Sequence, residues 1–232
     1  HPAYTSKSYV SGSWTTLDLS SDIADAAIFA IFESNHTNLV GFNFRAYGST
    51  DNRQPSDTCG HKWYLAPLDA NKKTQLWAET GASIDLIGYI KYGTIRTNAV
   101  ELTSVTNNGA YQIPTEIASD MPSGATAVVI EISGTSLYSF AMRKMAHSGV
   151  DDIYYDLNYH NGFNAVGLNG NQLEIKSETG SGHKFWVIGY IHPYTITGTG
   201  EPSLSSLTSA GDGMVHLVGS GSVDIPQLSA IG

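Results

Sequence analysis

Two polar stretches about a hundred residues apart resemble one another, RAYGSTDNR at 45–53 and RKMAHSGVDD at 143–152. Each follows a strand-like segment and precedes a histidine. Carboxylates and imidazoles can ligate a metal ion, and together with a guanidinium they can hydrogen-bond a sugar. The two candidate sets are Asp51, Arg53 and His61, and Asp151, Asp152 and His160.

The composition of these stretches favours a simpler interpretation. Gly, Ser, Asp and Asn are turn formers whose side chains bond to nearby backbone groups. The arginine that ends the first stretch is missing from the second, and a duplicated catalytic site would not usually tolerate that loss. We therefore predict that 45–53 and 143–152 are two copies of a loop.

A second group of candidate residues is aromatic. The run YYDLNYHNGF at 154–163 is loop-like, aromatic and acidic together, and rings of this kind could stack on sugars if they are exposed. The alternatives are contact with another protein chain and partial burial in a core or interface. The candidate ligand contacts are Tyr154, Tyr155, Tyr159, Phe163 and, from an earlier strand, Trp63.

Sequence patterns of known catalytic sites do not occur in the chain. It has no Gly-rich phosphate loop, no GxSxG elbow, and no carboxylate spacing typical of a paired acid and base. Its eight histidines fall in no HExxH or paired-cysteine pattern, so we predict no metal site. The acidic stretch 149–156 leaves Ca²⁺ as the one cofactor alternative. We predict that the chain is not an enzyme.

The elements that position these residues occur twice. AAIFAIFES at 26–34 corresponds to TAVVIEISG at 126–134, and LIGYI at 86–90 corresponds to VIGYI at 187–191. Between them Arg45 corresponds to Arg143, and His61 to His160. Landmarks in the same order at nearly constant spacing indicate an internal duplication.

Each copy consists of short apolar segments separated by turn residues. The segment VGFNFRA alternates apolar and polar residues, as a half-buried strand does. The best helix candidate is 20–32, but its counterpart 118–130 contains Pro122 and Gly124, so we predict a loop followed by a strand in both. The residues 93–109 that join the copies also contain a strand-like segment. The sequence predicts an all-β protein of two tandem β-sandwich domains, jelly-roll-like, at 1–97 and 98–195.

Composition limits the partners. A formal net charge of -9 repels nucleic acid, and no apolar run reaches the roughly 20 residues of a membrane span, so we expect neither nucleic acid binding nor membrane insertion. Cys59, the one cysteine, cannot form an intrachain disulfide. Residues 196–232 are rich in Gly, Ser and Thr, and they contain a strand-like segment at 214–218 and a second extended segment, GSGSVDIPQLSAIG, at 219–232. We predict that this segment is an extended arm.

The order of landmarks, from GFNFR through GSTDNR and HKW to LIGYI, resembles the repeats of β-sandwich proteins on phage virions, namely capsid decoration, tail and fibre proteins. The tail GSGSVDIPQLSAIG is similar to the strand repeats of phage fibres. The resemblance implies a structural or adhesive subunit at the virion surface or outside the cell. It also implies a homo-oligomer, often a trimer, that contacts other virion proteins.

Two alternative functions remain open. The aromatic run is compatible with a tandem carbohydrate-binding module that takes surface glycans. A cellular surface-layer or filament subunit would share the same physical properties.

Overall fold

The computed structural model describes residues 5–23, 26–53, 56–81, 83–134, 138–146, 154–157, 161–195 and 215–216. For residues 5, 35–40, 56–62, 138, 154–157, 161, 194–195 and 215–216 the description covers the backbone alone. Nearly all regular structure in these residues is β-strand, and the strands up to residue 191 pair antiparallel. The predicted all-β class is confirmed.

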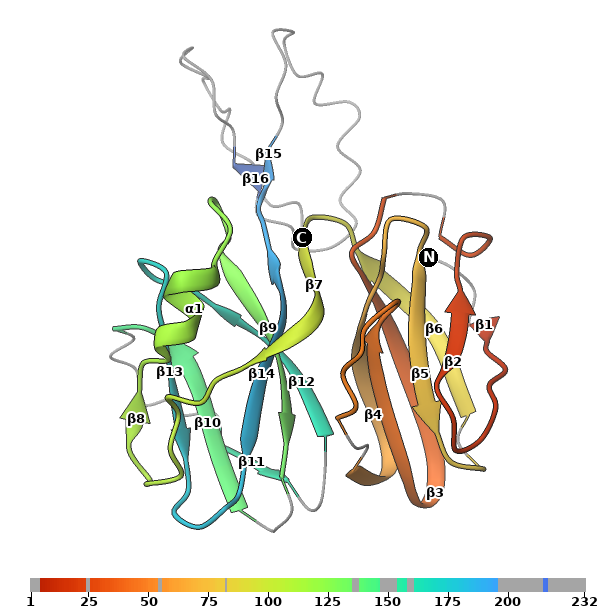
Figure 1. The fold of residues 1–232 in the computed structure, drawn as a ribbon, viewed down its shortest axis with the longest axis horizontal. Helices are drawn as coiled ribbons and strands as arrows, with labels where there is room; N and C mark the ends of the chain where they lie inside the picture. The colour runs from red at the N-terminus through yellow and green to blue at the C-terminus, as the bar shows by residue number, and fades with distance from the viewer. Residues whose placement is uncertain are drawn as a thin grey trace, which may run out of the picture. The chain divides into compact units, whose positions relative to one another are not determined.

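Six strands make up the first half of the chain, residues 5–90 (Figure 1). They are β1 (Thr5–Ser6), β2 (Thr15–Asp18), β3 (Phe29–Ala46), β4 (Ser56–Pro67), β5 (Lys73–Ala78) and β6 (Ser83–Ile90). The long strand β3 pairs with β6 through its first part and with β5 through its last part. Strand β4 runs along both parts of β3, while β1 pairs with β6 and β2 pairs with β5.

Eight strands make up the second half, residues 93–191. They are β7 (Gly93–Glu101), β8 (Tyr111–Gln112), β9 (Ala127–Ser133), β10 (Tyr138–Lys144), β11 (Tyr154–Leu157), β12 (Asn161–Gly167), β13 (Leu173–Ser177) and β14 (Lys184–Ile191). They form two sheets, in the orders β12-β9-β14-β7 and β11-β10-β13-β8. Strand β7 confirms the strand expected between residues 93 and 109.

The same pairings occur in both halves. In the first half the single strand β3 pairs with β4, β6 and β5. In the second half two strands take the place of β3: β9 pairs with β12 and β14, and β10 pairs with β11 and β13. The register shift of β6 against β3 at Ile31/Phe32 returns in β14 against β9 at Val187/Gly189. Glu33 pairs with Trp63 and Asp85, and Glu131 pairs with Phe163 and Trp186.

This register places Glu33 level with Glu131, an offset of ninety-eight rather than the hundred that the segments 26–34 and 126–134 suggest. Loop hydrogen bonds agree between the halves as well. The N–H of Gly12 donates to the carbonyl of Ala78 at 2.9 Å, and the N–H of Gly109 donates to that of Ser177 at 2.7 Å. Both glycines have positive φ, of 71° and 76°, a conformation that favours glycine.

One helix, α1 (Thr115–Asp120), lies where the sequence predicts a loop. The prediction of a loop followed by a strand at 118–130 is therefore wrong for residues 118–120, while the strand is present as β9. Pro122 and Gly124 are not inside the helix but follow it, because the chain leaves the helical conformation at Met121. Proline disfavours a helical residue before it, so Pro122 marks the end of this short helix.

Apolar side chains divide into two cores, one within each half. Phe42 and Phe44 alternate along β3 into the first core, as predicted, and Ile130 and Ile132 do the same along β9 in the second. Asn43, between the two phenylalanines, is also fully buried. Its side chain points away from the first core, so a further set of contacts must cover that face.

Residues 1–192 form one compact unit, and residues 193–232 form another. In the second unit β15 (Tyr194–Thr195) pairs in parallel with β16 (Val215–His216). The strand expected at 214–218 is therefore present at Val215–His216. The predicted domain boundaries at 97 and 195 stay predictions, as does the extended arm.

Candidate functional site

Residues 47–53 of the stretch RAYGSTDNR form a loop, as predicted, while Arg45 and Ala46 are the last residues of β3. Arg45, at the end of β3, donates from Nε to Oε1 of Gln75 at 2.9 Å and lies over the Trp14 ring at 4.1 Å. Its Nη1 also donates to the carbonyl oxygen of Asp51. These bonds fix the loop against the outer face of β5.

The second half repeats this arrangement. Nε of Arg143 donates to Oε2 of Glu174 at 2.6 Å, and the guanidinium lies over the Tyr111 ring at 3.7 Å. The Arg45 and Arg143 positions are thus equivalent in the structure as well as in the sequence. Each arginine braces the end of a strand, which is a structural role.

The end of the same loop crosses to the second half. Arg53 pairs with Asp51 in its own loop and, through Nη2, with Oε2 of Glu131 at 2.8 Å. Nδ2 of Asn43 donates to the other carboxylate oxygen of Glu131 at 3.0 Å. The amide of Asn43 is oriented for this because its Oδ1 accepts from the N–H of Phe44 at 2.7 Å. We call Asn43, Asp51, Arg53 and Glu131 the clamp.

Further bonds join the loop to β7. The backbone N–H of Ala99 donates to Oδ2 of Asp51 at 2.7 Å. Oδ1 of Asn98 accepts from Oγ of Ser49 at 3.0 Å and from the N–H of Thr50 at 3.1 Å. The loop 45–53 is therefore bonded to two strands of the second half, β9 and β7.

Burial dominates the electrostatics of the clamp. The Glu131 side chain is completely buried, and this burial raises the pKa of its carboxyl group, while the Arg53 guanidinium and the Asn43 amide act to lower it. Burial by itself would lower the pKa of Arg53, but the carboxylates of Glu131 and Asp51 outweigh it, so that pKa is raised. Each charge in the clamp thus depends on its partner.

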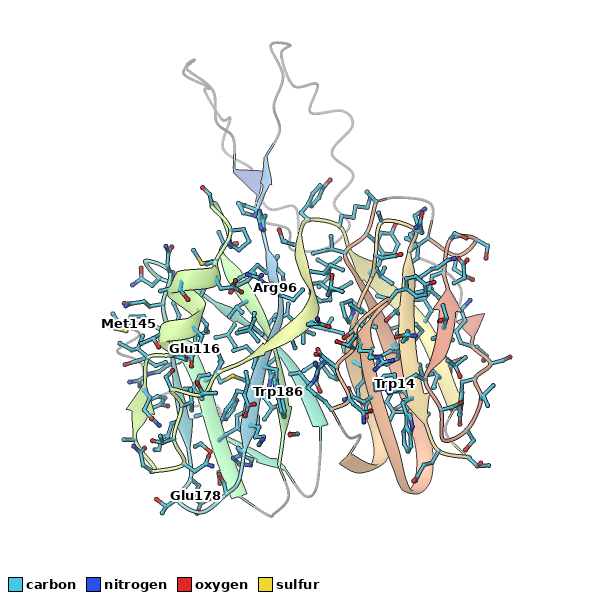
Figure 2. The ribbon with its side chains drawn as sticks, viewed as in Figure 1. Trp14, Arg96, Glu116, Met145, Glu178 and Trp186 are labelled. Atoms are coloured by element: carbon cyan, nitrogen blue, oxygen red, sulfur yellow. The ribbon has the colours of Figure 1, made fainter. Side chains whose placement is uncertain are left out.

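An apolar seam accompanies the clamp. Strand β12 lies against β4, and β7 lies against β3 (Figure 1). Figure 2 shows Trp186 on the side of the second half that faces the first. Phe29, Val129 and Ile188 form the buried centre of the seam. The half-buried residues packed around them are Ile28, Leu65, Ile90, Ile95, Ala99, Phe163 and Ile191.

Phe163, one of the predicted ligand contacts, lies in this seam. Its ring meets the buried ring of Tyr64 edge-on, with the centroids 5.6 Å apart. It contributes packing between the halves.

Trp63, another predicted contact, is on the surface. Its side chain is 67% exposed, and its Nε1 donates to Oε1 of Glu33 at 3.1 Å. Of the predicted aromatic contacts whose side chains are described, it alone presents its ring to solvent. A sugar or another protein can reach this ring.

The other predicted residues are placed by backbone only or lie outside the described residues. Tyr154 and Tyr155 belong to β11, where they pair with Ala141 and Phe140. His61 lies in β4, paired with Asn35. Tyr159, Asp151, Asp152 and His160 lie outside the described residues.

A cavity of about 260 Å³ lies next to β10. Its wall includes Ala141, the backbone partner of Tyr154. The lining residues are Gly109, Ser139, Phe140, Ala141, Lys176 and Glu178. The lining includes one lysine and one glutamate, which could hydrogen-bond a small polar ligand.

Sequence reasoning missed Asn43, Asn98 and Glu131, on which the clamp and its bonds to β7 depend. Glu131 did give a signal, because it stands in the otherwise apolar strand AVVIEIS. A carboxylate in a strand of this kind must be paired when it is buried. The partner could not be identified, because Arg53 is seventy-eight residues away.

Among the described residues, no group of three or more His, Cys, Asp or Glu side chains is arranged to hold a metal ion. No helix in the same part of the chain is long and apolar enough to cross a membrane. No protein-family model matches the chain, and a search of the curated proteins also finds no match.

Proposed function

We propose that the chain is a non-enzymatic structural subunit of a virion surface or appendage, such as a phage capsid decoration, tail or fibre protein. It acts by assembling with copies of itself and with other virion proteins, at the virion surface or outside the cell. The observation that carries this proposal is the clamp. Its charged side chains pair with one another across the two halves. The loop 45–53, which the sequence suggested as a candidate site, therefore serves to join the halves.

The strand order supports a jelly-roll-like unit in each half as part of this proposal. If β3 and β4 are each counted as two strands, each half has eight strands. Numbered one to eight along the chain within each half, these strands form two sheets, in the orders 1-8-3-6 and 2-7-4-5. Two four-stranded sheets in this order are typical of jelly rolls, a fold common in viral capsid proteins. Two such units joined by a buried clamp suit a rigid spacer or surface layer.

The assembly state of the purified chain tests this function. We expect a trimer or larger oligomer in solution, because subunits of this kind act through contacts between chains. A stable monomer over a wide range of protein concentration would count against it. A cellular surface-layer or filament subunit would behave alike, and the source of the protein would separate the two.

A tandem carbohydrate-binding module is the second candidate, favoured by the cavity beside β10 and β13. We expect saturable binding on a broad glycan array that is lost in Tyr155→Ala. Phe163→Ala is the less informative variant, because Phe163 packs in the seam and its loss would destabilise the protein. An array on which the intact chain binds nothing removes this candidate.

A further inference from the structure

The cavity of about 260 Å³ next to β10, here called the β10 cavity, lies on the outer face of its sheet. Phe140 and Met142 on β10 point into the second core, so Ser139 and Ala141, which alternate with them, belong to the opposite face. Lys176 lies on that face of β13, directly opposite Ala141. Ser139, Ala141 and Lys176 all line the cavity.

A pair of hydrogen bonds shows that the first half has a matching face. Oε2 of Glu79 accepts from the N–H of Gly41 at 2.9 Å, and Oε2 of Glu178 accepts from the N–H of Ser139 at 2.9 Å. Gly41 is therefore the counterpart of Ser139, and Glu79 is the counterpart of Glu178, which also lines the cavity.

In the first half an indole ring covers this face. Trp77 lies opposite Asn43 on β3, as Lys176 lies opposite Ala141 on β10. The far edge of the Trp77 ring lies over Gly41, where an added Cβ would stand 2.8 Å from Cζ3 and 3.3 Å from Cη2. The ring buries the backbone of Gly41.

The second half has a cavity there because two side chains differ. Ala141 is smaller than its counterpart Asn43, and Lys176 extends towards β8, with Nζ 5.5 Å from the centre of the Tyr111 ring. Protein surfaces that pack closely leave few spaces of this size. The same strand arrangement thus offers in one half the place that its duplicate fills with the indole of Trp77.

Trp63 presents an indole that can fill this place. Its side chain is 67% exposed, the largest fraction among the large apolar residues that the structure describes. Its Nε1 donates to Oε1 of Glu33 at 3.1 Å, which leaves the opposite edge, with Cζ3 and Cη2, for apolar contact. This is the edge that Trp77 places over Gly41. Since Trp63 is exposed in its own chain, the cavity that it fills belongs to another copy.

We propose that Trp63 of one copy docks into the β10 cavity of a second copy. The first half of one chain then contacts the second half of the next, so copies add head to tail and either close into a ring, such as a trimer, or extend as a filament. Lys176 in the cavity wall contributes an ammonium group that is attracted to the face of an aromatic ring. The inference rests on the proposed function, because it names a contact through which the copies assemble.

Sedimentation velocity of the intact chain over a range of concentrations tests this contact. Trp63→Ala should weaken the association of copies at least about tenfold, because an aromatic side chain seated in a pocket carries much of the binding energy of an interface. Val10→Ala, which shortens another exposed apolar side chain of the first half, is the matched control and should leave the association unchanged.

A second variant blocks the cavity from within. Lys176→Trp introduces the residue that the first half has at the equivalent position, and it should weaken association as Trp63→Ala does. Lys184→Trp, which places a tryptophan at an exposed position on β14, is its control and should have no effect. Near-ultraviolet circular dichroism reports that each variant is folded.

Mixing the two variants gives the most specific result. Trp63→Ala keeps the cavity, and Lys176→Trp keeps the exposed Trp63, so one intact contact can form between them. We expect a 1:1 complex in the mixture at a concentration at which neither variant forms a dimer alone.

The outcomes separate this contact from the proposed function. If Trp63→Ala associates as the intact chain does, or if the mixture associates no more strongly than its parts, the contact is overturned and assembly through another surface stands. An intact chain that is monomeric at every concentration overturns both. Saturable binding of N-acetyltryptophanamide by such a monomer would assign the cavity to an aromatic side chain of a different protein instead.

Discussion

Arg53 of the first half and Glu131 of the second form an ion pair, 2.8 Å from Nη2 to Oε2, in which the carboxylate is completely buried. The pair ties the end of a loop to the middle of a strand in the other half. A buried charge that loses its partner stays desolvated without compensation, so the completely buried Glu131 should depend strongly on Arg53, whereas Arg53 also has Asp51 as a partner.

Arg53→Met should lower the free energy of unfolding by about 3–5 kcal/mol, because it leaves the Glu131 carboxylate buried without a counter-charge, and Glu131→Gln should cost less, because Arg53 keeps its pair with Asp51. The double variant should be more stable than the sum of the two single changes predicts. Urea unfolding at neutral pH measures this. Lys184→Ala, which breaks the exposed pair with Glu101, is the control and should change stability by less than about 1 kcal/mol. Single clamp variants as stable as this control would contradict the role of the clamp.

Two glycines at equivalent positions should respond differently to alanine. At Gly189 a Cβ would stand 2.5 Å from the carbonyl oxygen of Thr94 and 2.6 Å from Cζ of Phe29, whereas at Gly88 the nearest atom is Cδ1 of Ile31 at 3.5 Å. Gly189→Ala should therefore destabilise the protein by about 1–3 kcal/mol through overpacking of the seam.

Gly88→Ala is the matched control and should be nearly neutral, because a methyl group there makes ordinary contact. Thermal unfolding of the two variants side by side compares them. Equal losses would mean that the seam does not pack Gly189 closely.

Acid should weaken the contact between α1 and the chain before it. Glu116 is only partly desolvated, which raises its pKa, but hydrogen bonds from Ser104 and Thr103 to its carboxylate outweigh this and lower the pKa from 4.5 to about 2. A lowered pKa in the folded state means that the ionised form stabilises folding. This stabilisation is complete above about pH 4.5 and is lost as the pH falls towards 2.

Glu116→Gln should therefore be less stable than the parent chain at pH 7, and the difference should shrink between pH 4.5 and pH 2. Urea unfolding at several pH values measures it. A difference that stays constant down to pH 2 would show that the carboxylate of Glu116 is not favoured in its ionised form by folding.

Local patterns in the sequence were enough to predict most of the strands. The alternation of Phe42 and Phe44 along β3 was enough to predict a half-buried strand, and the two matching segments LIGYI and VIGYI became β6 and β14. The helix α1 was missed because Pro122 was taken to interrupt a helix that in fact ends before it.

The clamp could be predicted only in part. Arg53 and Asp51 were recognised as polar loop residues, but the sequence indicated only local partners for them. The decisive partner, Glu131, is brought close by the packing of one half on the other, and no sequence periodicity reports such packing. Phe163 shows the same limit. An aromatic residue in a polar run is predicted to be exposed, but in the structure Phe163 packs against Tyr64 of the first half.

The mass of the purified protein, measured by light scattering, tests most directly whether the chain functions by assembling with copies of itself. The intact chain, 24.8 kDa as a monomer, is compared with a variant that ends at residue 195. We predict that the intact chain is a trimer or larger and that the shortened chain falls to smaller species, because the segment 196–232 is proposed to act as an arm between chains. A monomer in both cases would contradict the account and favour the carbohydrate-binding alternative.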